Sequence, residues 1–348
     1  MSFLKPPSRR TVLAGSVASF GLMALSDAAA AIAPPGISLI EAPSNLGLSP
    51  TGPGPEPGCW QAPAAFRQAG FQGSLRPAET IVLDRPAYRA EAQAGTRLRN
   101  GLTIRTYSER LAASVANALG AGRFPVVLGG DCSILLGCLL GARRAGRLGL
   151  VHIDGHSDYA NPSNYDTTQR LGAAAGMDLA LATGKGEATL TRWDGVAGPL
   201  VEPLDAVQLG ERNVDGTGHP YPDFPAAGIA QWTVQDIARI GVVPSAGAAL
   251  QHLAGRGIDR FWIHLDLDVL AESVLPAVDS PGEPGLALDA LEEMLVPILG
   301  DPGALGIDVT IYDPARDPDW RHAPALSRML LSSLRHAGRV MEPESPPA

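Results

Sequence analysis

Cysteine is scarce in this chain of 348 residues, which contains only Cys59, Cys132 and Cys138. Three is too few, and an odd number, for a disulfide scaffold. Clusters of basic residues are also lacking, and the formal net charge is −9. This argues against a nucleic-acid partner, because the sequence has no Lys/Arg cluster to contact phosphates. With 45% hydrophobic residues, the chain is instead able to bury a large core.

Long apolar runs are absent except near the N-terminus. There the run 11–25 follows Arg9 and Arg10 and precedes small residues that end at Ala30. This order is typical of an export signal, and paired arginines resemble a twin-arginine signal. We therefore predict that residues 1–30 are a signal, that the protein is periplasmic or otherwise exported, and that no stable membrane span remains after signal removal. An uncleaved anchor is the alternative, although the run is short for a span of about 20 residues.

Beyond residue 36, short apolar runs alternate with helix-like patterns. Leu111, Val115 and Leu119 have helical spacing, and Asp289 and Glu292 resemble a capping box at the start of a later helix. Runs of Val, Ile and Leu separated by helices predict an α/β fold with a parallel sheet covered on both faces. Strands are expected at 37–42, 80–84, 125–128, 148–154, 206–209, 260–266 and 305–311.

Three of these predicted strands lead into chemically reactive side chains. The predicted strand 125–128 is followed by "GGDCS", in which Cys132 stands at the mouth of a tight turn. The carboxyl ends of parallel strands are where α/β proteins hold ligands and metals. Cys132 is therefore a packing residue, a nucleophile or a metal ligand.

The second and third segments are rich in carboxylates. "DGHSD" places Asp154, His156 and Asp158 at alternate positions, and "HLDLD" places Asp266 and Asp268 two residues apart. Alternate side chains of an extended chain share one face, so we expect each set to converge. Either motif alone has a simpler interpretation as a polar turn after a strand. Both together, each at a strand end, indicate a functional site.

So many carboxylates in one place need cations, because like charges a few ångströms apart cannot all stay ionised. Two divalent ions about 3.5–4 Å apart, bridged by carboxylates, would neutralise them and activate a water molecule. The residues themselves thus predict a dinuclear metallohydrolase.

"GGDCS", "DGHSD" and "HLDLD" resemble, in order and spacing, the metal motifs of the ureohydrolases, the arginase/agmatinase/formiminoglutamase family. "GCWQAPAAFRQAGF" at 58–71, "LGERNVD" at 209–215 and "DVTIYDPARD" at 308–317 resemble other segments of that family. The similarity covers 36–335, which we expect to be one metallohydrolase domain, followed by a C-terminal tail at 336–348. The resemblance implies a three-layer, doubly wound α/β sandwich on a mostly eight-stranded parallel sheet.

The resemblance also implies roles for individual residues. Asp154 and Asp266 would bridge two ions, with Cys132 and Asp158 on one ion and His156 and Asp268 on the other. A metal-bridging hydroxide would attack a small linear amidine, such as a guanidino or hydroxyguanidino compound. The expected ions are two Mn²⁺ per chain. The implied metal ligands are Cys132, Asp154, His156, Asp158, Asp266 and Asp268, with Asp154 and Asp266 as the catalytic pair.

Cys132 departs from the family pattern, which usually has histidine at this position. A minority branch, which includes the hydroxyarginine hydrolase of D-cycloserine biosynthesis, resembles this chain in having cysteine there. A thiolate is a softer ligand than imidazole and adds a negative charge, which favours Zn²⁺, Co²⁺ or Fe²⁺ as alternatives to Mn²⁺.

Two further departures concern the substrate. Ile311 aligns with the glutamate by which the family recognises a guanidinium group, and Ala175 aligns with its proton-shuttling histidine. Asp313 would point the same way as residue 311 if the strand continued, and Asp178 is the acidic residue close to Ala175. We therefore expect that arginine is not the substrate.

Other assignments follow from the same resemblance. Asn161, Asp215 and Asp313 are expected to bind the substrate. Independently of the resemblance, the position of His264 within an apolar strand suggests a hydrogen bond behind Asp266. The family tends to form trimers or hexamers, so a homo-oligomer is also an expectation. Two alternatives stay open: a metal-binding homologue with little or no ureohydrolase activity, and a deacetylase-type amidohydrolase with one zinc ion.

Overall fold

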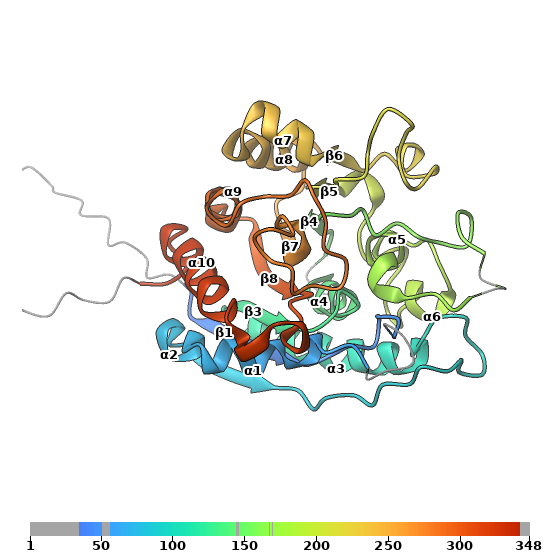
Figure 1. Ribbon diagram of the computed structural model, residues 1–348, viewed down its shortest axis with the longest axis horizontal. Coiled ribbons are helices and arrows are strands. Elements are labelled where there is room, and N and C mark those ends of the chain that lie inside the picture. The colour runs from blue at the N-terminus through green and yellow to red at the C-terminus, as the bar shows by residue number, and fades with distance from the viewer. Residues whose placement is uncertain (1–34, 51–55, 144–145, 167, 169, 342–348) are drawn as a thin grey trace, which may run out of the picture. The chain divides into compact units, whose positions relative to one another are not determined.

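The computed structural model describes residues 35–50, 56–143, 146–166, 168 and 170–341. The expected signal at 1–30 and residues 342–348 of the expected tail lie outside this part. Its strands form one eight-stranded sheet with helices on both faces (Figure 1). None of the helices described is both long and apolar enough to cross a membrane.

The sheet is entirely parallel, with the strand order β2-β1-β3-β8-β7-β4-β5-β6. This confirms the predicted fold class. The runs of Val, Ile and Leu located seven strands to within two residues at each end. The eighth, β6, was missed because it has only three half-buried residues. The strands are β1 (Ile37–Ala42), β2 (Glu79–Val82), β3 (Phe124–Gly129), β4 (Gly149–Ile153), β5 (Ala206–Leu209), β6 (Ala230–Trp232), β7 (Phe261–Asp266) and β8 (Ala304–Thr310).

Alternate residues of the central strands enter two separate hydrophobic cores, one on each face of the sheet. Val127 of β3 packs in the core with α3 (Gly101–Gly120), α4 (Ile134–Arg143), α5 (Asp178–Ala182) and α6 (Ala188–Thr191). Val126 and Leu128 pack in the other core. Its helices are α1 (Ala62–Gln68), α2 (Phe71–Leu75), α7 (Val234–Ile240), α8 (Val242–Gly255), α9 (Leu288–Gly300) and α10 (Ala323–His336).

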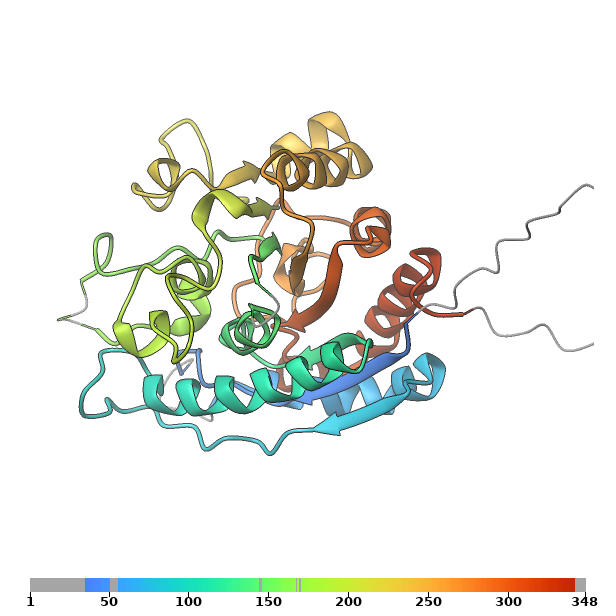
Figure 2. The ribbon, with the colours of Figure 1, turned by 180° about the vertical axis from the view of Figure 1, so that it is seen from behind.

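The figures show the three layers directly. In Figure 1, α9 and α10 lie to the left of β7 and β8, and α4 and α5 lie to the right; Figure 2 shows the same arrangement from behind. Strands buried on both faces explain why their sequences read as continuous apolar runs.

The predicted capping box at Asp289 is wrong. The N-cap of helix α9 is Ala287, two residues before Asp289, and the Asp289 carboxylate accepts a hydrogen bond from the amide of Ala290 at 2.8 Å. A capping box does form at α7, between Thr233 and Asp236.

The strand order places a switch point in the middle of the sheet. β3 and β4 follow one another in the chain but are separated by β8 and β7. Connections from these central strands diverge at their carboxyl ends, where open α/β sheets bind their ligands. The candidate residues after β3, β4 and β7 all lie at this edge.

Candidate metal centre

The turn after β3 is built to hold Cys132 at the carboxyl edge of the sheet. The Asp131 carboxylate accepts hydrogen bonds from Ser44 Oγ at 2.6 Å, from the Gly47 amide at 2.9 Å and from the Ser133 amide at 3.0 Å. The first two bonds tie the turn to the loop that follows β1, and the third closes the turn itself. At the adjoining Gly130 a Cβ atom would lie 1.7 Å from the carbonyl oxygen of Ser44, so the close approach requires glycine.

Cys132 faces a carboxylate. Its buried thiol donates a hydrogen bond to Asp266 Oδ2 at 2.7 Å and lies 3.4 Å from Thr310 Oγ1. Burial, followed by the charge of Asp266, raises the pKa of the thiol well above its ordinary value. The short contact is stable only with a proton or a cation between sulfur and oxygen, and a cation is what a metal site supplies.

Asp154, His156 and Asp268 form one group whose ligand atoms all lie within 4.8 Å of one another. His156 Nδ1 lies 3.0 Å from Asp268 Oδ2 and 3.7 Å from Asp154 Oδ1. Asp154 Oδ1 also accepts a hydrogen bond from the His156 amide at 2.7 Å. The structure therefore brings together side chains from the ends of the adjacent strands β4 and β7.

Asp158 reaches the carboxylate cluster from a turn, whereas an extended segment was expected. The segment after β4 is not extended: the strand ends at Ile153, and Asp158 has a φ of 42°, in the left-handed region. Asp158 is buried and belongs to the same charged cluster. Burial, with the charges of Asp178 and Asp266, raises the pKa of its carboxyl group well above the ordinary value.

Asp266 and Asp268 are fixed by the turn that ends β7. Asp266 Oδ1 accepts a hydrogen bond from the Asp268 amide at 2.7 Å, and Asp268 Oδ1 accepts one from the Gly155 amide at 3.2 Å. The buried guanidinium of Arg212 donates to the carbonyl oxygen of Asp268.

The two carboxyl groups differ in acidity. Burial and the charge of Asp268 raise the pKa of Asp266 to about 8. Burial also acts to raise the pKa of Asp268, but His156 and Arg212 outweigh it and lower that pKa below its ordinary value. Burial and neighbouring carboxylates thus disfavour the ionised form of Asp266, and a bound cation would favour it instead.

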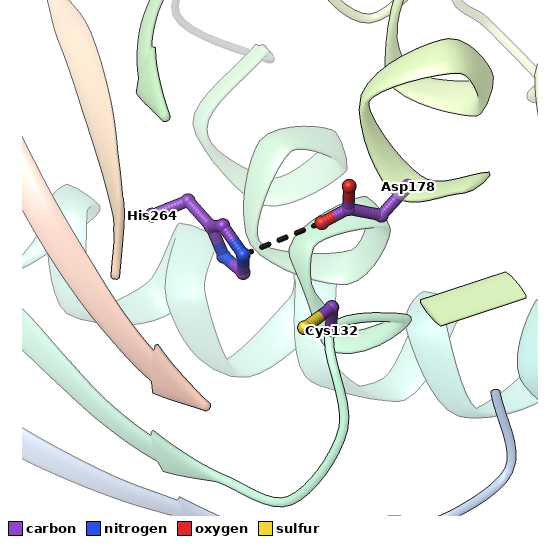
Figure 3. A group of neighbouring side chains, drawn as sticks. All are labelled: Cys132, Asp178 and His264. Atoms are coloured by element: carbon purple, nitrogen blue, oxygen red, sulfur yellow. Dashed lines mark ion pairs between the residues drawn. The ribbon is translucent and has the colours of Figure 1, made fainter. Parts of the chain in front are cut away.

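A second group of buried polar side chains lies next to these carboxylates, and the sequence did not predict how its members pair. The group consists of His152, Asp178, His264 and Asp308. His264 Nδ1 lies 2.6 Å from Asp308 Oδ2, and Asp178 lies between His264 and His152. A hydrogen bond between His264 and Asp266 was expected, but His264 bonds to Asp308 instead. Figure 3 shows that Asp178 and His264 point toward each other beside Cys132.

The residues expected to bind substrate have partners within the protein. Asn161 Nδ2 donates to Asp223 Oδ2 at 3.1 Å, and Asn161 Oδ1 accepts from Ser163 Oγ at 2.6 Å. Asp215 is exposed and accepts a hydrogen bond from the Thr217 amide at 2.7 Å. These contacts shape the loops after β4 and β5, and the assigned substrate roles stay predictions.

Asp313 does not share a strand face with residue 311, contrary to expectation. β8 ends at Thr310, and Ile311 is buried with a φ of 71°, an unusual conformation for a β-branched residue. The Asp313 carboxylate instead accepts a hydrogen bond from the Ala315 amide at 2.9 Å and begins the short 3₁₀ turn Pro314–Arg316. Backbone strain of this kind is typical of functional sites.

Ala175 is buried, and its amide bonds to the Gly47 carbonyl at 3.1 Å. A histidine that sequence analysis did not consider, His219, lies close to the DGHSD segment. Its Nε2 atom is 3.2 Å from Ser157 Oγ, and its ring stacks on Phe224. His219 lies in the loop between β5 and β6, where no spacing pattern marks it.

Fold and site together define an α/β protein with a cluster of potential metal ligands at the carboxyl edge of its parallel sheet. Residues 37–335 match the model of the Arginase family. Arginase from Bacillus caldovelox is 34% identical over 257 residues, which are 72% of this chain and 81% of that protein. Arginase from Bacillus subtilis (strain 168) is 30% identical over 255 residues, with the same two coverages.

The native structure of the Bacillus caldovelox arginase superposes with a TM-score of 0.74 and 27% identity, covering 89% of this chain and 99% of that chain. The chain belongs to the arginase family. It is therefore a hydrolase of the ureohydrolase type, as the three motifs predicted.

Proposed function

We propose that this protein hydrolyses a C–N bond of a small linear amidine, a guanidino or hydroxyguanidino compound, with the help of two divalent metal ions. The observation that carries the proposal is the meeting of Cys132, Asp154, His156, Asp266 and Asp268 at one edge of the sheet. When bound, two ions would lower the pKa of a water molecule and polarise the carbon that it attacks.

The donor atoms fit such ions. Asp154 Oδ2 is buried and makes no hydrogen bond within the described part of the chain, and the Cys132–Asp266 contact needs a cation or a proton. Asp154 and Asp266 would be shared by both ions. Cys132 and Asp158 would complete one ligand set, and His156 and Asp268 the other. Mn²⁺ suits the carboxylates, whereas the thiol favours Zn²⁺, Co²⁺ or Fe²⁺.

Neighbouring residues hold this donor set in place. Arg212 and the Gly155 amide orient Asp268, and a Cβ atom at Gly155 would lie 1.9 Å from Arg212 Nη2. Asp131 fixes the turn that carries Cys132. Such supporting contacts commonly decide metal affinity as much as the ligands do.

The substrate is a compound other than arginine. Ile311 and Ala175 are buried and apolar, so neither can bind a cation nor transfer a proton. Asn161, Asp215 and Asp313 are proposed to contact the substrate, and residues 1–30 to direct export. The same two apolar residues support a second candidate function, a metal-binding homologue with little ureohydrolase activity.

An assay of the purified, manganese-loaded protein tests the proposal. Guanidino, hydroxyguanidino, formimino and amide compounds are incubated with it, and release of urea, ammonia or formamide is measured. We expect turnover of at least one amidine. Asp266→Asn should reduce it by more than about a hundredfold, because loss of supporting contacts alone costs ten- to a hundredfold.

Asp289→Asn, on the exposed side of α9, is the matched control and should leave turnover unchanged. Turnover of an amide alone would indicate the deacetylase type. Absence of turnover on every compound by protein that binds two ions would support the second candidate instead.

A further inference from the structure

The loop between β7 and α9 carries an acidic side chain, Asp279, beside the candidate metal centre. This loop is fixed on both sides of Asp279. The Ala277 carbonyl accepts a hydrogen bond from the Asp313 amide at 2.9 Å, just beyond the end of β8. On the other side, a Cβ atom at Gly282 would lie 2.8 Å from Arg212 Nη1. Asp279 therefore lies on a short stretch of chain that runs from the end of β8 to the guanidinium group of Arg212.

The same stretch of chain brings Asp279 near the expected metal ligands. Arg212, which lies against Gly282, also donates a hydrogen bond to the carbonyl oxygen of Asp268. Burial raises the pKa of the Asp279 carboxyl group above its ordinary value against the opposing charge of Arg316, and the charge of Asp268 adds to the rise. Asp279 thus lies within electrostatic range of the metal centre without being one of its expected ligands.

The Asp279 carboxylate is only partly neutralised. Within the part of the chain that the structure describes, the one cationic group within 4.0 Å is Arg316, whose Nη2 atom lies 4.0 Å from Asp279 Oδ1. This guanidinium group has closer partners, because Nη1 donates to the Val278 carbonyl at 2.9 Å and Nε lies 3.6 Å from Asp313 Oδ2. With 31% of its side chain exposed, Asp279 can accept a second cation from solvent.

Asp313, the neighbouring carboxylate, is less available to a ligand. Its side chain is 7% exposed, and its two oxygens accept hydrogen bonds from the Ala315 amide at 2.9 Å and the Gly58 amide at 3.3 Å. Ile311 is buried and apolar. Asp279 is therefore the more accessible carboxylate at this end of β8.

We propose that Asp279 binds the positively charged end of the substrate and makes the enzyme prefer cationic amidines to neutral amides. An amidinium group presents two parallel N–H donors, which a carboxylate accepts as a bidentate pair. Asp279 lies on the loop after β7, whereas residue 311 follows β8, so the cation would occupy a different position from the one that the family's glutamate defines. The expectation that arginine is a poor substrate is unchanged. This inference rests on the proposed amidine substrate, but binding tests it without turnover.

The competing role is structural. If Asp279 only holds Arg316 in place, loss of its carboxylate should weaken the binding of charged and uncharged ligands alike. The two roles therefore differ in whether the effect of Asp279 depends on the charge of the ligand.

Two ligands that differ by one charge separate these roles. n-Butylguanidinium and n-butylurea have the same alkyl chain and similar planar head groups, but only the first is a cation at neutral pH. Isothermal titration of each into the manganese-loaded full-length protein gives the two dissociation constants. We expect the wild type to bind n-butylguanidinium more tightly than n-butylurea. Asp279→Asn should weaken binding of the cation alone by about tenfold, because hydrogen bonds to charged groups contribute more than neutral ones.

Two further variants serve as controls. Asp279→Glu keeps the charge and should retain a preference for the cation. Asp289→Asn removes the same charge from the exposed side of α9 and should change neither dissociation constant.

Three results would overturn the inference. They are a wild type that binds both ligands equally, an Asp279→Asn variant that binds both as the wild type does, and one that loses affinity for both by the same factor. Circular dichroism checks folding, and if Asp279→Asn does not fold, Asp279→Ser takes its place beside the wild-type comparison. Because neither ligand has to be hydrolysed, absence of turnover and absence of a charge preference are separate results.

Discussion

Cys132 Sγ lies 2.7 Å from Asp266 Oδ2, although 134 positions separate the two residues in the chain. The contact joins the turn after β3 to the end of β7, two strands away in the sheet. Cys138, in contrast, is buried among the apolar side chains of α4 and its neighbours. The two cysteines therefore have different surroundings, and only Cys132 faces the carboxylate cluster.

Cys132→Ser should weaken binding of one metal ion by about ten- to a hundredfold, because an alcohol is hard to deprotonate and is a poor ligand. Cys138→Ser is the matched control: it buries a hydroxyl group and costs stability but should not alter metal affinity. Isothermal titration of metal into the metal-free proteins measures both. If Cys132→Ser binds both ions as tightly as the wild type, Cys132 is a packing residue.

Cys132→His should retain two ions and shift the pH profile of activity to lower pH. A neutral imidazole in place of a thiolate makes the site one unit more positive, and a more positive metal pair makes its bound water more acidic. The measurement is kcat against pH, on whichever amidine is turned over. A profile that stays in place or moves to higher pH would contradict the assignment of a thiolate ligand.

The metal-free protein should lose stability as pH rises from about 4 to 9. Burial and Asp268 raise the pKa of Asp266 from 3.8 to about 8, whereas Asp308 and Asp178 outweigh burial and raise the pKa of His264 from 6.5 to about 9. Both groups bind a proton more tightly in the folded state. Unfolding therefore releases protons, and the free energy of unfolding falls as pH rises through each window.

Each group contributes at most about 1.4 kcal/mol per pH unit within its window. Calorimetry of chelator-treated protein from pH 5 to 9 should show a falling Tm, with a shallower fall between pH 5 and 8 for Asp266→Asn. Added metal should stabilise more at higher pH, since the ligands must be deprotonated. If the Tm of the metal-free protein rises from pH 5 to 9, the raised pKa values of Asp266 and His264 are wrong.

The sequence was informative wherever the physical signal is local. Continuous Val, Ile and Leu runs mark strands buried on both faces, so the strands and the site edge were predictable. Asp154 and Asp266 were found because each directly follows such a run. β6 was missed because its three residues carry no such run. The predicted direction of the Asp313 side chain was wrong, because the strand ends in a backbone turn at Ile311, where φ is 71°.

The second group of buried polar side chains depends on strand register, which no local pattern encodes. His264 pairs with His152 across β7 and β4, and with Asp308 across β7 and β8. Each of these residues stands alone in an apolar run, so each reads as an isolated buried polar group. Their common cluster exists only because β7 lies between β4 and β8.

Arginine and agmatine should be poor substrates, because Ile311 and Ala175 provide neither a carboxylate nor an imidazole. We expect kcat/KM on arginine to be more than tenfold below that of the Bacillus caldovelox arginase measured in parallel, or about 1.4 kcal/mol less transition-state stabilisation. Hydroxyguanidino and other amidines are the positive comparison. Turnover of arginine within tenfold of that enzyme would show that other residues replace the two missing groups.

Elemental analysis of the purified protein tests the dinuclear centre most directly. After loading with manganese and zinc and removal of free ions, all divalent metals are counted together per chain, for the wild type and for Asp268→Ala. The two ligand sets that share Asp154 and Asp266 predict two ions per chain in the wild type. They predict one ion fewer in Asp268→Ala. One ion or fewer in the wild type, with the same number in Asp268→Ala, would contradict it.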